Sequence, residues 1–163
     1  TIYYKGVDEK AWKVLDKNTQ KKGAYLWDTL RLPDGKYQVK LTASDDPDNP
    51  QETAFIAENM IQPIVIGNSR PNIKSLGAAA GTEGKDVISG AARDDYSNVV
   101  KVQYTIDGQE WTSAYPVDGV FDSLEEPFQI TTRPLVPGNY TLIVNAFDSE
   151  GNIGIEKVLI EVK

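Results

Sequence analysis

The stretch Leu135 to Asn152, LVPGNYTLIVNAFDSEGN, decides the fold because the chain contains it twice. The earlier copy, Leu32 to Asn49, reads LPDGKYQVKLTASDDPDN. Adding 103 to a residue number in the earlier copy gives its counterpart without a gap, so that Tyr37 corresponds to Tyr140. In each copy a turn with glycine precedes a tyrosine, and apolar residues then occupy alternate positions. A turn followed by an alternating strand is one supersecondary unit, and the second copy predicts a second unit.

The repeat extends upstream of the turn. The same offset aligns Tyr25, Trp27 and Thr29 with Phe128, Ile130 and Thr132. Both segments have the alternation of side chains that is typical of strands. Further upstream, Tyr4 to Trp12 (YKGVDEKAW) resembles Tyr104 to Trp111 (YTIDGQEW), which is one residue shorter. Both segments predict a hairpin, and Asp107-Gly108 is the clearer two-residue turn. In this alignment Trp12 and Trp111 are equivalent residues.

Short strands and turns fill the rest of the chain. We expect strands at 37–43, 62–66, 73–80, 87–92, 100–106, 128–132 and 157–162, and turns at 81–84 and at Asp118-Gly119. Residues 53–60 fit either a strand or a short helix. A turn every eight to twelve residues is typical of an antiparallel sandwich or barrel, with apolar side chains facing inward. The sequence therefore predicts an all-β protein.

Composition excludes several classes of function. The net charge is −7 with no basic run, which argues against nucleic acid as a partner because phosphate binding needs clustered positive charge. The chain has no cysteine and no histidine, which removes disulfides, thiolate nucleophiles, the usual zinc ligands and the commonest general base. No apolar run reaches a membrane-spanning length, so we expect no membrane insertion.

The duplicated motif, Leu-x-x-Gly-x-Tyr followed by an alternating strand that ends in Ala-x-Asp, resembles the E–F corner of fibronectin type III and related immunoglobulin-like domains. The resemblance implies that Tyr37 and Tyr140 donate their hydroxyls back to the backbone as tyrosine corners. Residues 72–163 also resemble the sandwich domains at the C-terminal end of large bacterial β-propeller proteins. That likeness implies an extracytoplasmic bacterial protein.

The resemblance implies two tandem sandwich domains, at residues 1–68 and 69–163, with the boundary in the polar linker Gly67 to Asn72. The second domain has room for two strands before Val99, whereas the first has almost nothing before Tyr4. We therefore expect the first domain to lack its N-terminal strands, which an upstream segment or another molecule would supply. A sandwich without them would leave an apolar face uncovered.

Acidic loops are the only constellation in the sequence that suggests chemistry. They contain Asp45, Asp46 and Asp48, then Asp94 and Asp95, then Asp148 and Glu150. In a sandwich Asp94, Asp95 and Asp148 lie at one end, where oxygen ligands suit calcium. The favoured interpretation is that these side chains cap turns, because no EF-hand spacing is present. We therefore assign no metal, cofactor or catalytic residue.

The tryptophans Trp12, Trp27 and Trp111 suggest either a sugar-stacking platform or half-buried packing, and their repeated positions favour packing. Nothing in the sequence indicates a cleft in which paired carboxylates could hydrolyse a glycoside. There is also no Gly-x-Ser-x-Gly nucleophile elbow. We expect a protein that is not an enzyme, a non-catalytic accessory region that spaces or docks a neighbouring domain of the same parent chain or another protein. The alternative is a carbohydrate- or protein-recognition module that uses exposed aromatic side chains.

Overall fold

The computed structural model describes residues 1–17, 24–46, 48–49, 53–80 and 85–162. These residues form thirteen strands and no helix, in three antiparallel sheets, so the predicted all-β class is confirmed. The chain divides into two compact units, Thr1–Ile66 (unit 1) and Gly67–Lys163 (unit 2), which are described separately. The turn predicted at residues 81–84 lies outside the described residues.

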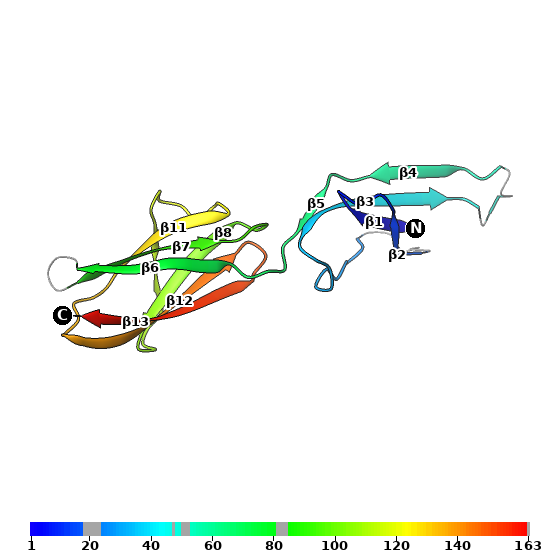
Figure 1. Ribbon diagram of the computed structural model, residues 1–163. Helices are drawn as coiled ribbons and strands as arrows, with labels where there is room; N and C mark the ends of the chain where they lie inside the picture. Colours follow the sequence, from blue (N-terminus) through cyan, green and yellow to red (C-terminus); the bar gives the residue numbers. More distant parts are fainter. Residues whose placement is uncertain (18–23, 47, 50–52, 81–84, 163) are drawn as a thin grey trace. The chain divides into compact units, whose positions relative to one another are not determined.

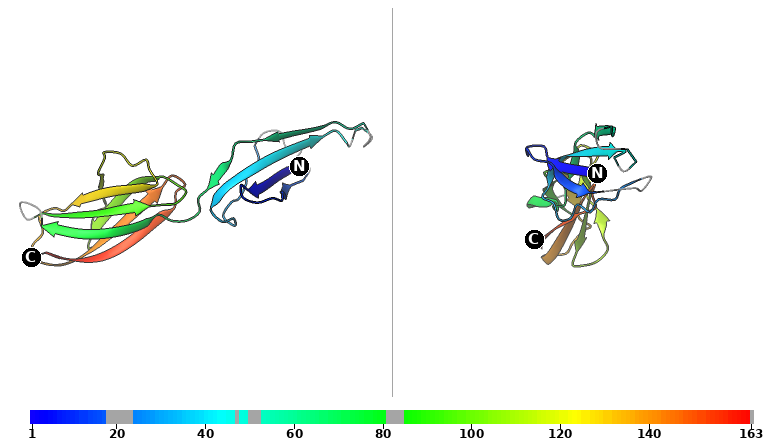
Figure 2. Two further views of the ribbon diagram at one scale, coloured as in Figure 1. Left: turned by 45° about the horizontal axis from the view of Figure 1, so that its top comes forward. Right: turned by 90° about the vertical axis from the view of Figure 1, so that its right-hand side faces the viewer.

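Unit 2 contains two four-stranded sheets (Figures 1 and 2). The first has the order β10-β11-β7-β6 and contains β6 (Asn72–Ala80), β7 (Asp86–Arg93), β10 (Tyr115–Pro116) and β11 (Glu125–Thr131). The second has the order β13-β12-β8-β9 and contains β8 (Val99–Ile106), β9 (Thr112–Ser113), β12 (Gly138–Asp148) and β13 (Ile153–Val162). The chain changes sheet between β9 and β10.

The core of unit 2 lies between these two sheets. Strict alternation in β11 buries Phe128 and Ile130, and alternation in β12 buries Leu142 and Val144. Side chains of a strand point to opposite faces at every second residue, so one face of each sheet is apolar. The two apolar faces together form one cluster of fourteen buried side chains among the described residues. Unit 2 is therefore a two-layered, sandwich-like domain.

The turn predicted at Asp107-Gly108 is confirmed. Both residues have positive φ, 52° for Asp107 and 67° for Gly108. A two-residue hairpin turn of this hand matches the twist of its strands. It joins β8 to β9, where Tyr104 pairs with Thr112.

Unit 1 contains one sheet among its described residues. Its strands are β1 (Ile2–Gly6), β2 (Lys13–Asp16), β3 (Gly35–Ser44), β4 (Ile56–Met60) and β5 (Ile64–Ile66). The order is β2-β1-β3-β4, and β5 also pairs with β3. The ambiguous segment 53–60 thus contributes a strand. Because β4 and β5 both pair with β3, they together take the place that β13 has beside β12.

Strand register corrects the alignment of the two hairpins. Tyr4 pairs with Val39, and Ile106 pairs with Leu142. Val39 and Leu142 are repeat counterparts, so Tyr4 corresponds to Ile106 and not to Tyr104. The sequence alignment was therefore wrong by two residues, and Trp12 and Trp111 are not equivalent. Unit 1 has a longer connection between its two hairpin strands, which a sequence match anchored on aromatic residues does not detect.

The strand predicted at residues 25–30 does not form. Its repeat counterpart lies in β11, which pairs with β7 over seven residues from Glu125 to Thr131. The described part of unit 1 offers no strand equivalent to β7. A strand needs a hydrogen-bonding neighbour, which an alternating pattern alone does not provide. Residues 24–29 therefore have no regular structure.

The tyrosine corners are present in both copies of the repeat. The Tyr37 hydroxyl donates to the carbonyl of Pro33 at 2.7 Å, and the Tyr140 hydroxyl donates to that of Val136 at 2.9 Å. In each copy the acceptor lies four residues before the tyrosine. The proline position differs between the copies, yet the bond is the same. Each hydroxyl thereby fixes the turn that leads into the central strand of its sheet.

Removing this hydroxyl should weaken unit 2 modestly. We expect Tyr140→Phe to lower the free energy of unfolding by about 0.5–1.5 kcal/mol, because one hydrogen bond is lost while the ring remains. Urea unfolding measures the change. Tyr115→Phe is the control, since the Tyr115 ring is exposed. Equal losses in the two variants would contradict a role for the corner.

Candidate functional site

The repeat allows the same face of two sheets to be compared residue by residue. In unit 2 the side chains of Leu142, Val144 and Ala146 are fully buried beneath the other sheet. Their counterparts in unit 1 are Val39, Leu41 and Ala43. The Leu41 side chain is 49% exposed, against 0% for Val144, and Ala43 is exposed as well. Chemically similar positions therefore have opposite burial in the two units.

One end of this face in unit 1 is covered by an aromatic cluster. The ring centroid of Trp27 lies 5.0 Å from that of Tyr4 and 6.3 Å from that of Tyr37, the latter edge-on. Such tilted and edge-on contacts are favourable. Trp27 corresponds to Ile130 of β11, so it covers the sheet without belonging to a strand. Tyr37 is consequently buried, and exposure rises along β3 toward Ala43.

We define the open face as Val39, Leu41 and Ala43 of β3 together with Ala57 of β4. Ala57 pairs directly with Ala43, so the two side chains lie on the same side of the sheet. All four side chains are apolar. The open face is the feature of unit 1 that most resembles an unfinished core.

The two units differ sharply in how much apolar surface they bury. Among the described residues, Ile2, Tyr37 and Ile66 are the buried apolar side chains of unit 1, whereas unit 2 has fourteen. A single sheet with one uncovered face is marginally stable in water, because its strands lack a second layer to pack against. Unit 1 is therefore expected to gain stability from anything that covers the open face.

The sheet edges of unit 2 are poorly suited to association. β6 has a register shift between Lys74 and Gly77, and β9 and β10 have only two residues each. In the long strand β13, Glu156 pairs with the inward-facing Val144, so a carboxylate lies on the core side of the edge. Bulges, short edge strands and inward charges all discourage edge-to-edge pairing.

The two tryptophans of unit 1, Trp12 and Trp27, have different surroundings. The amines of Lys5 and Lys40 lie 5.2 and 5.3 Å from the Trp12 ring centroid, and Trp27 belongs to the aromatic cluster. Trp111 is 44% exposed. The half-buried packing expected from the sequence is therefore found for Trp12 and Trp27. Trp111 is the exception.

Burial also affects the acidity of two tyrosines on the inner faces. It raises the pKa of Tyr37 and the pKa of Tyr104, because the charged phenolate loses hydration. Both hydroxyls donate to backbone carbonyls, Tyr104 to that of Thr131 at 3.2 Å. The raised pKa extends the neutral, donating form further into the alkaline pH range.

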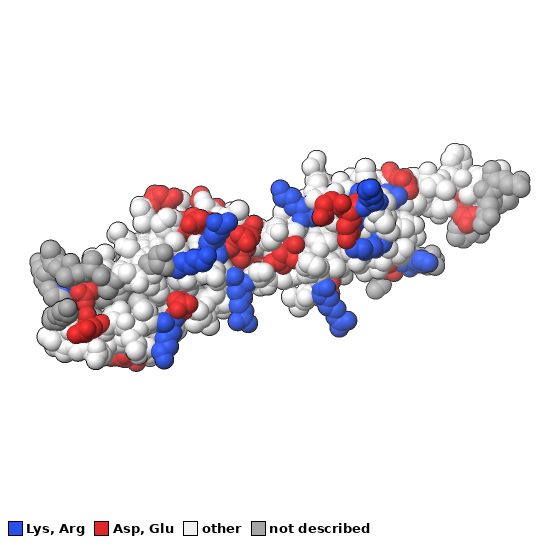
Figure 3. Space-filling view, viewed as in Figure 1, with Lys and Arg blue, Asp and Glu red and all other residues white. Residues whose placement is uncertain are grey.

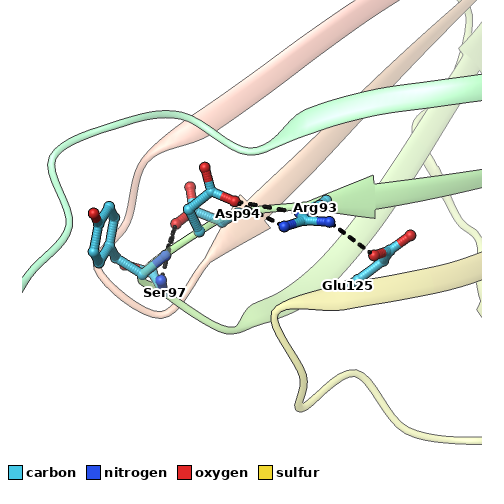
Figure 4. Close-up of polar contacts among 6 residues, drawn as sticks. Arg93, Asp94, Ser97 and Glu125 are labelled. Carbon is cyan, nitrogen blue, oxygen red and sulfur yellow. Dashed lines mark hydrogen bonds and ion pairs between the residues drawn. The ribbon is translucent and has the colours of Figure 1, made fainter. Parts of the chain in front are cut away.

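The acidic loops place their carboxylates on backbone N–H groups. Asp94 is buried, and its Oδ1 accepts from the amides of Tyr96 and Ser97, each at 2.9 Å (Figure 4). Asp95 instead contacts the guanidinium of Arg93, which also reaches Glu125. The Ser149 amide donates to the Asn98 carbonyl, so the loops after β7 and β12 are adjacent as predicted. The Asp95 carboxylate, predicted at this same end, is paired with Arg93.

The third acidic loop repeats the first. Asp148 Oδ1 accepts from the amides of Glu150 and Asn152, and its Oδ2 accepts from the Asn152 side-chain amide at 2.8 Å. In unit 1, Asn49 donates to Asp45 in the same way, also at 2.8 Å. Turn capping, the interpretation favoured from the sequence, thus describes both copies. In the described part of the chain, no group of three or more acidic side chains is arranged to hold a metal ion.

Asp148 should matter as a hydrogen-bond acceptor. We expect Asp148→Ala to cost about 2 kcal/mol of stability, because the part-buried amides of Glu150 and Asn152 lose their acceptor. Asp148→Asn, which keeps a carbonyl oxygen, should cost less. Thermal unfolding with and without calcium chloride provides the measurement. A clear calcium-dependent rise in the melting temperature that Asp148→Ala abolishes would show that the loop binds calcium.

Charged side chains are mixed over the face that Figure 3 shows, with acidic and basic groups interspersed in each unit. This agrees with the absence of a basic run in the sequence. The described part of the chain contains no helix that is long and apolar enough to cross a membrane. No protein-family model matches the chain, and no curated protein matches it.

Sequence reasoning anticipated an uncovered face but not its position. The alternating pattern marks Val39, Leu41 and Ala43 as inward-facing, just as it marks their buried counterparts in unit 2. Nothing local distinguishes Leu41 from Val144, because exposure depends on a second sheet that is distant in sequence. The segment 25–30 was expected to be a strand, but residues 24–29 have no regular structure, and the Trp27 ring covers one end of the sheet instead.

Proposed function

We propose that this chain is a non-catalytic accessory region of a larger extracytoplasmic bacterial protein, in which unit 2 is a self-contained spacer and unit 1 docks a neighbouring domain or another protein. The observation that carries the proposal is the contrast between Leu41 and Val144, counterparts in the repeat that are half-exposed and fully buried. A covered face in one copy and an open face in the other support the proposal of a partner for the open face.

The partner proposed for the open face is a pair of β-strands with alternating apolar side chains. In unit 2 the equivalent face packs against β6, β7 and β11, which contribute Ile73, Ile88 and Ala92 among others. In unit 1 the ring of Trp27, the repeat counterpart of Ile130 in β11, already covers one end of this face, so the strands proposed to be supplied correspond to β6 and β7. An upstream segment of the parent chain or another molecule would supply them.

Assignment of both units to the fibronectin III and immunoglobulin-like class is part of this proposal. It is supported by the two tyrosine corners and by the two-layered arrangement of unit 2. The resemblance to the sandwich domains of bacterial propeller proteins supports the extracytoplasmic location. A non-catalytic role is supported by the buried carboxylates, since Asp94 and Asp148 serve as acceptors for turn amides.

The proposal is tested in the parent protein with variants of the open face. Leu41→Asp should abolish association between unit 1 and its partner while leaving the catalytic turnover of neighbouring domains unchanged. Leu159→Asp is the matched control, because Leu159 is exposed on the outer face of unit 2. Association is measured by native mass spectrometry of the intact protein, and by limited proteolysis of unit 1 for contacts within one chain. Unchanged association in Leu41→Asp, or lost turnover with intact folding, would contradict the proposal.

A further inference from the structure

A pocket opens at one end of unit 2, between the β8–β9 hairpin of one sheet and the residues that follow β11 in the other. Its volume is about 280 Å³, and it is lined by Tyr104, Ile106, Gln109, Glu110, Thr112 and Arg133. A cavity of this size suits a ligand no larger than a single amino acid or sugar ring. It lies in unit 2 and is independent of the open face of unit 1.

The floor of the pocket is apolar and fixed. Tyr104 and Ile106 are buried residues of β8 whose side chains face the other sheet. The Tyr104 hydroxyl donates to the Thr131 carbonyl at 3.2 Å, which ties the floor to the end of β11. Thr112 pairs with Tyr104 and therefore lies on the same face of the hairpin. A ligand would meet a surface that is already ordered.

The walls of the pocket carry two opposite charges. Glu110 lies on the hairpin, and Arg133 follows β11 on the other sheet. Within the described residues neither side chain forms an ion pair, with the other or with a third group. The lining therefore carries one carboxylate and one guanidinium, on different elements, with no net charge.

We propose that this pocket binds a small zwitterion of amino-acid size. The guanidinium of Arg133 would bind the ligand carboxylate, because its planar donors match a carboxylate in a bidentate pair. Glu110 would bind the ammonium group. The apolar part of the ligand would rest on Tyr104 and Ile106, and Gln109 and Thr112 would bind polar atoms at the rim. A ligand with one charge can pair with only one of the two side chains, Glu110 or Arg133. A neutral polyol can form an ion pair with neither.

The test is a titration of the full chain with L-alanine, followed by the amide resonances of unit 2 in heteronuclear NMR spectra. Saturable shifts are expected at Glu110, Thr112 and Arg133. Propionate, ethylamine and methyl glucoside each retain only part of the zwitterion's chemistry. They should bind at least about tenfold more weakly, since each lacks one or both charge-assisted contacts.

Variants separate charge recognition from folding. Glu110→Gln and Arg133→Gln should each weaken L-alanine binding by about tenfold or more, whereas the exposed Glu161→Gln and Lys157→Gln should leave it unchanged. The double exchange Glu110→Arg with Arg133→Glu swaps the two charges and should restore binding, with well-dispersed spectra showing that the fold is intact. The proposal is overturned by unsaturable shifts with L-alanine, by equal binding of propionate or methyl glucoside, or by binding that survives both single variants.

Discussion

Replacing Val144 with aspartate should unfold unit 2, whereas the same replacement at Leu41 should change the stability of unit 1 by less than about 1 kcal/mol. Val144 is 0% exposed and belongs to the core cluster between the two sheets. A carboxylate there would be buried without a partner, which costs several kcal/mol. Because domains of this size have only about 5–15 kcal/mol of stability, that loss is expected to shift unit 2 toward the unfolded state.

Leu41 occupies the corresponding position of the repeat but is 49% exposed, so an aspartate there keeps much of its hydration. Amide hydrogen exchange of β12 and β3 measures both effects in one chain, since each strand reports on its own unit. The comparison is internally controlled because the two sites have the same backbone pairing. A destabilisation by Leu41→Asp as large as that by Val144→Asp would show that the open face is a closed core in solution.

Alanine at Gly154 should destabilise unit 2 by about 3 kcal/mol or more. A Cβ at Gly154 would overlap the carbonyl oxygen of Pro71 and lie 2.8 Å from its carbonyl carbon. These are backbone atoms, so relief requires moving the segment before β6 or the strand β13. Here the chain that enters the first sheet passes directly over an edge strand of the second.

Gly138 provides the matched control for this substitution. It lies at the start of β12, and a Cβ there would have its nearest neighbours at 3.8 and 3.9 Å, ordinary contact distances. Gly138→Ala should therefore be neutral or should stabilise by up to about 1 kcal/mol, because alanine restricts the unfolded chain. Urea unfolding of both variants gives the comparison. If Gly154→Ala is as mild as Gly138→Ala, the close approach of Pro71 is not a constraint in solution.

Much of the local structure could be predicted from the repeated stretch alone. Tyr37 and Tyr140 form the same hydroxyl-to-carbonyl bond, and the pairs Asp45–Asn49 and Asp148–Asn152 form the same side-chain bond. The Asp107-Gly108 turn and the alternating faces of β11 and β12 also follow from the sequence. These features depend on contacts within a few residues or on a period of two. Such patterns are therefore visible in the sequence itself.

The tertiary structure decided which of these patterns became strands, and which faces became buried. Residues 24–29 alternate like β11 but form no strand, because the described part of unit 1 has no neighbour equivalent to β7. Strand register shows that Tyr4 corresponds to Ile106, whereas the spacing of the aromatic residues had aligned it with Tyr104. Leu41 and Val144 have the same sequence pattern and opposite burial. The physical reason is that pairing and burial require strands distant in the chain, whereas a sequence pattern specifies only which side chains could be covered.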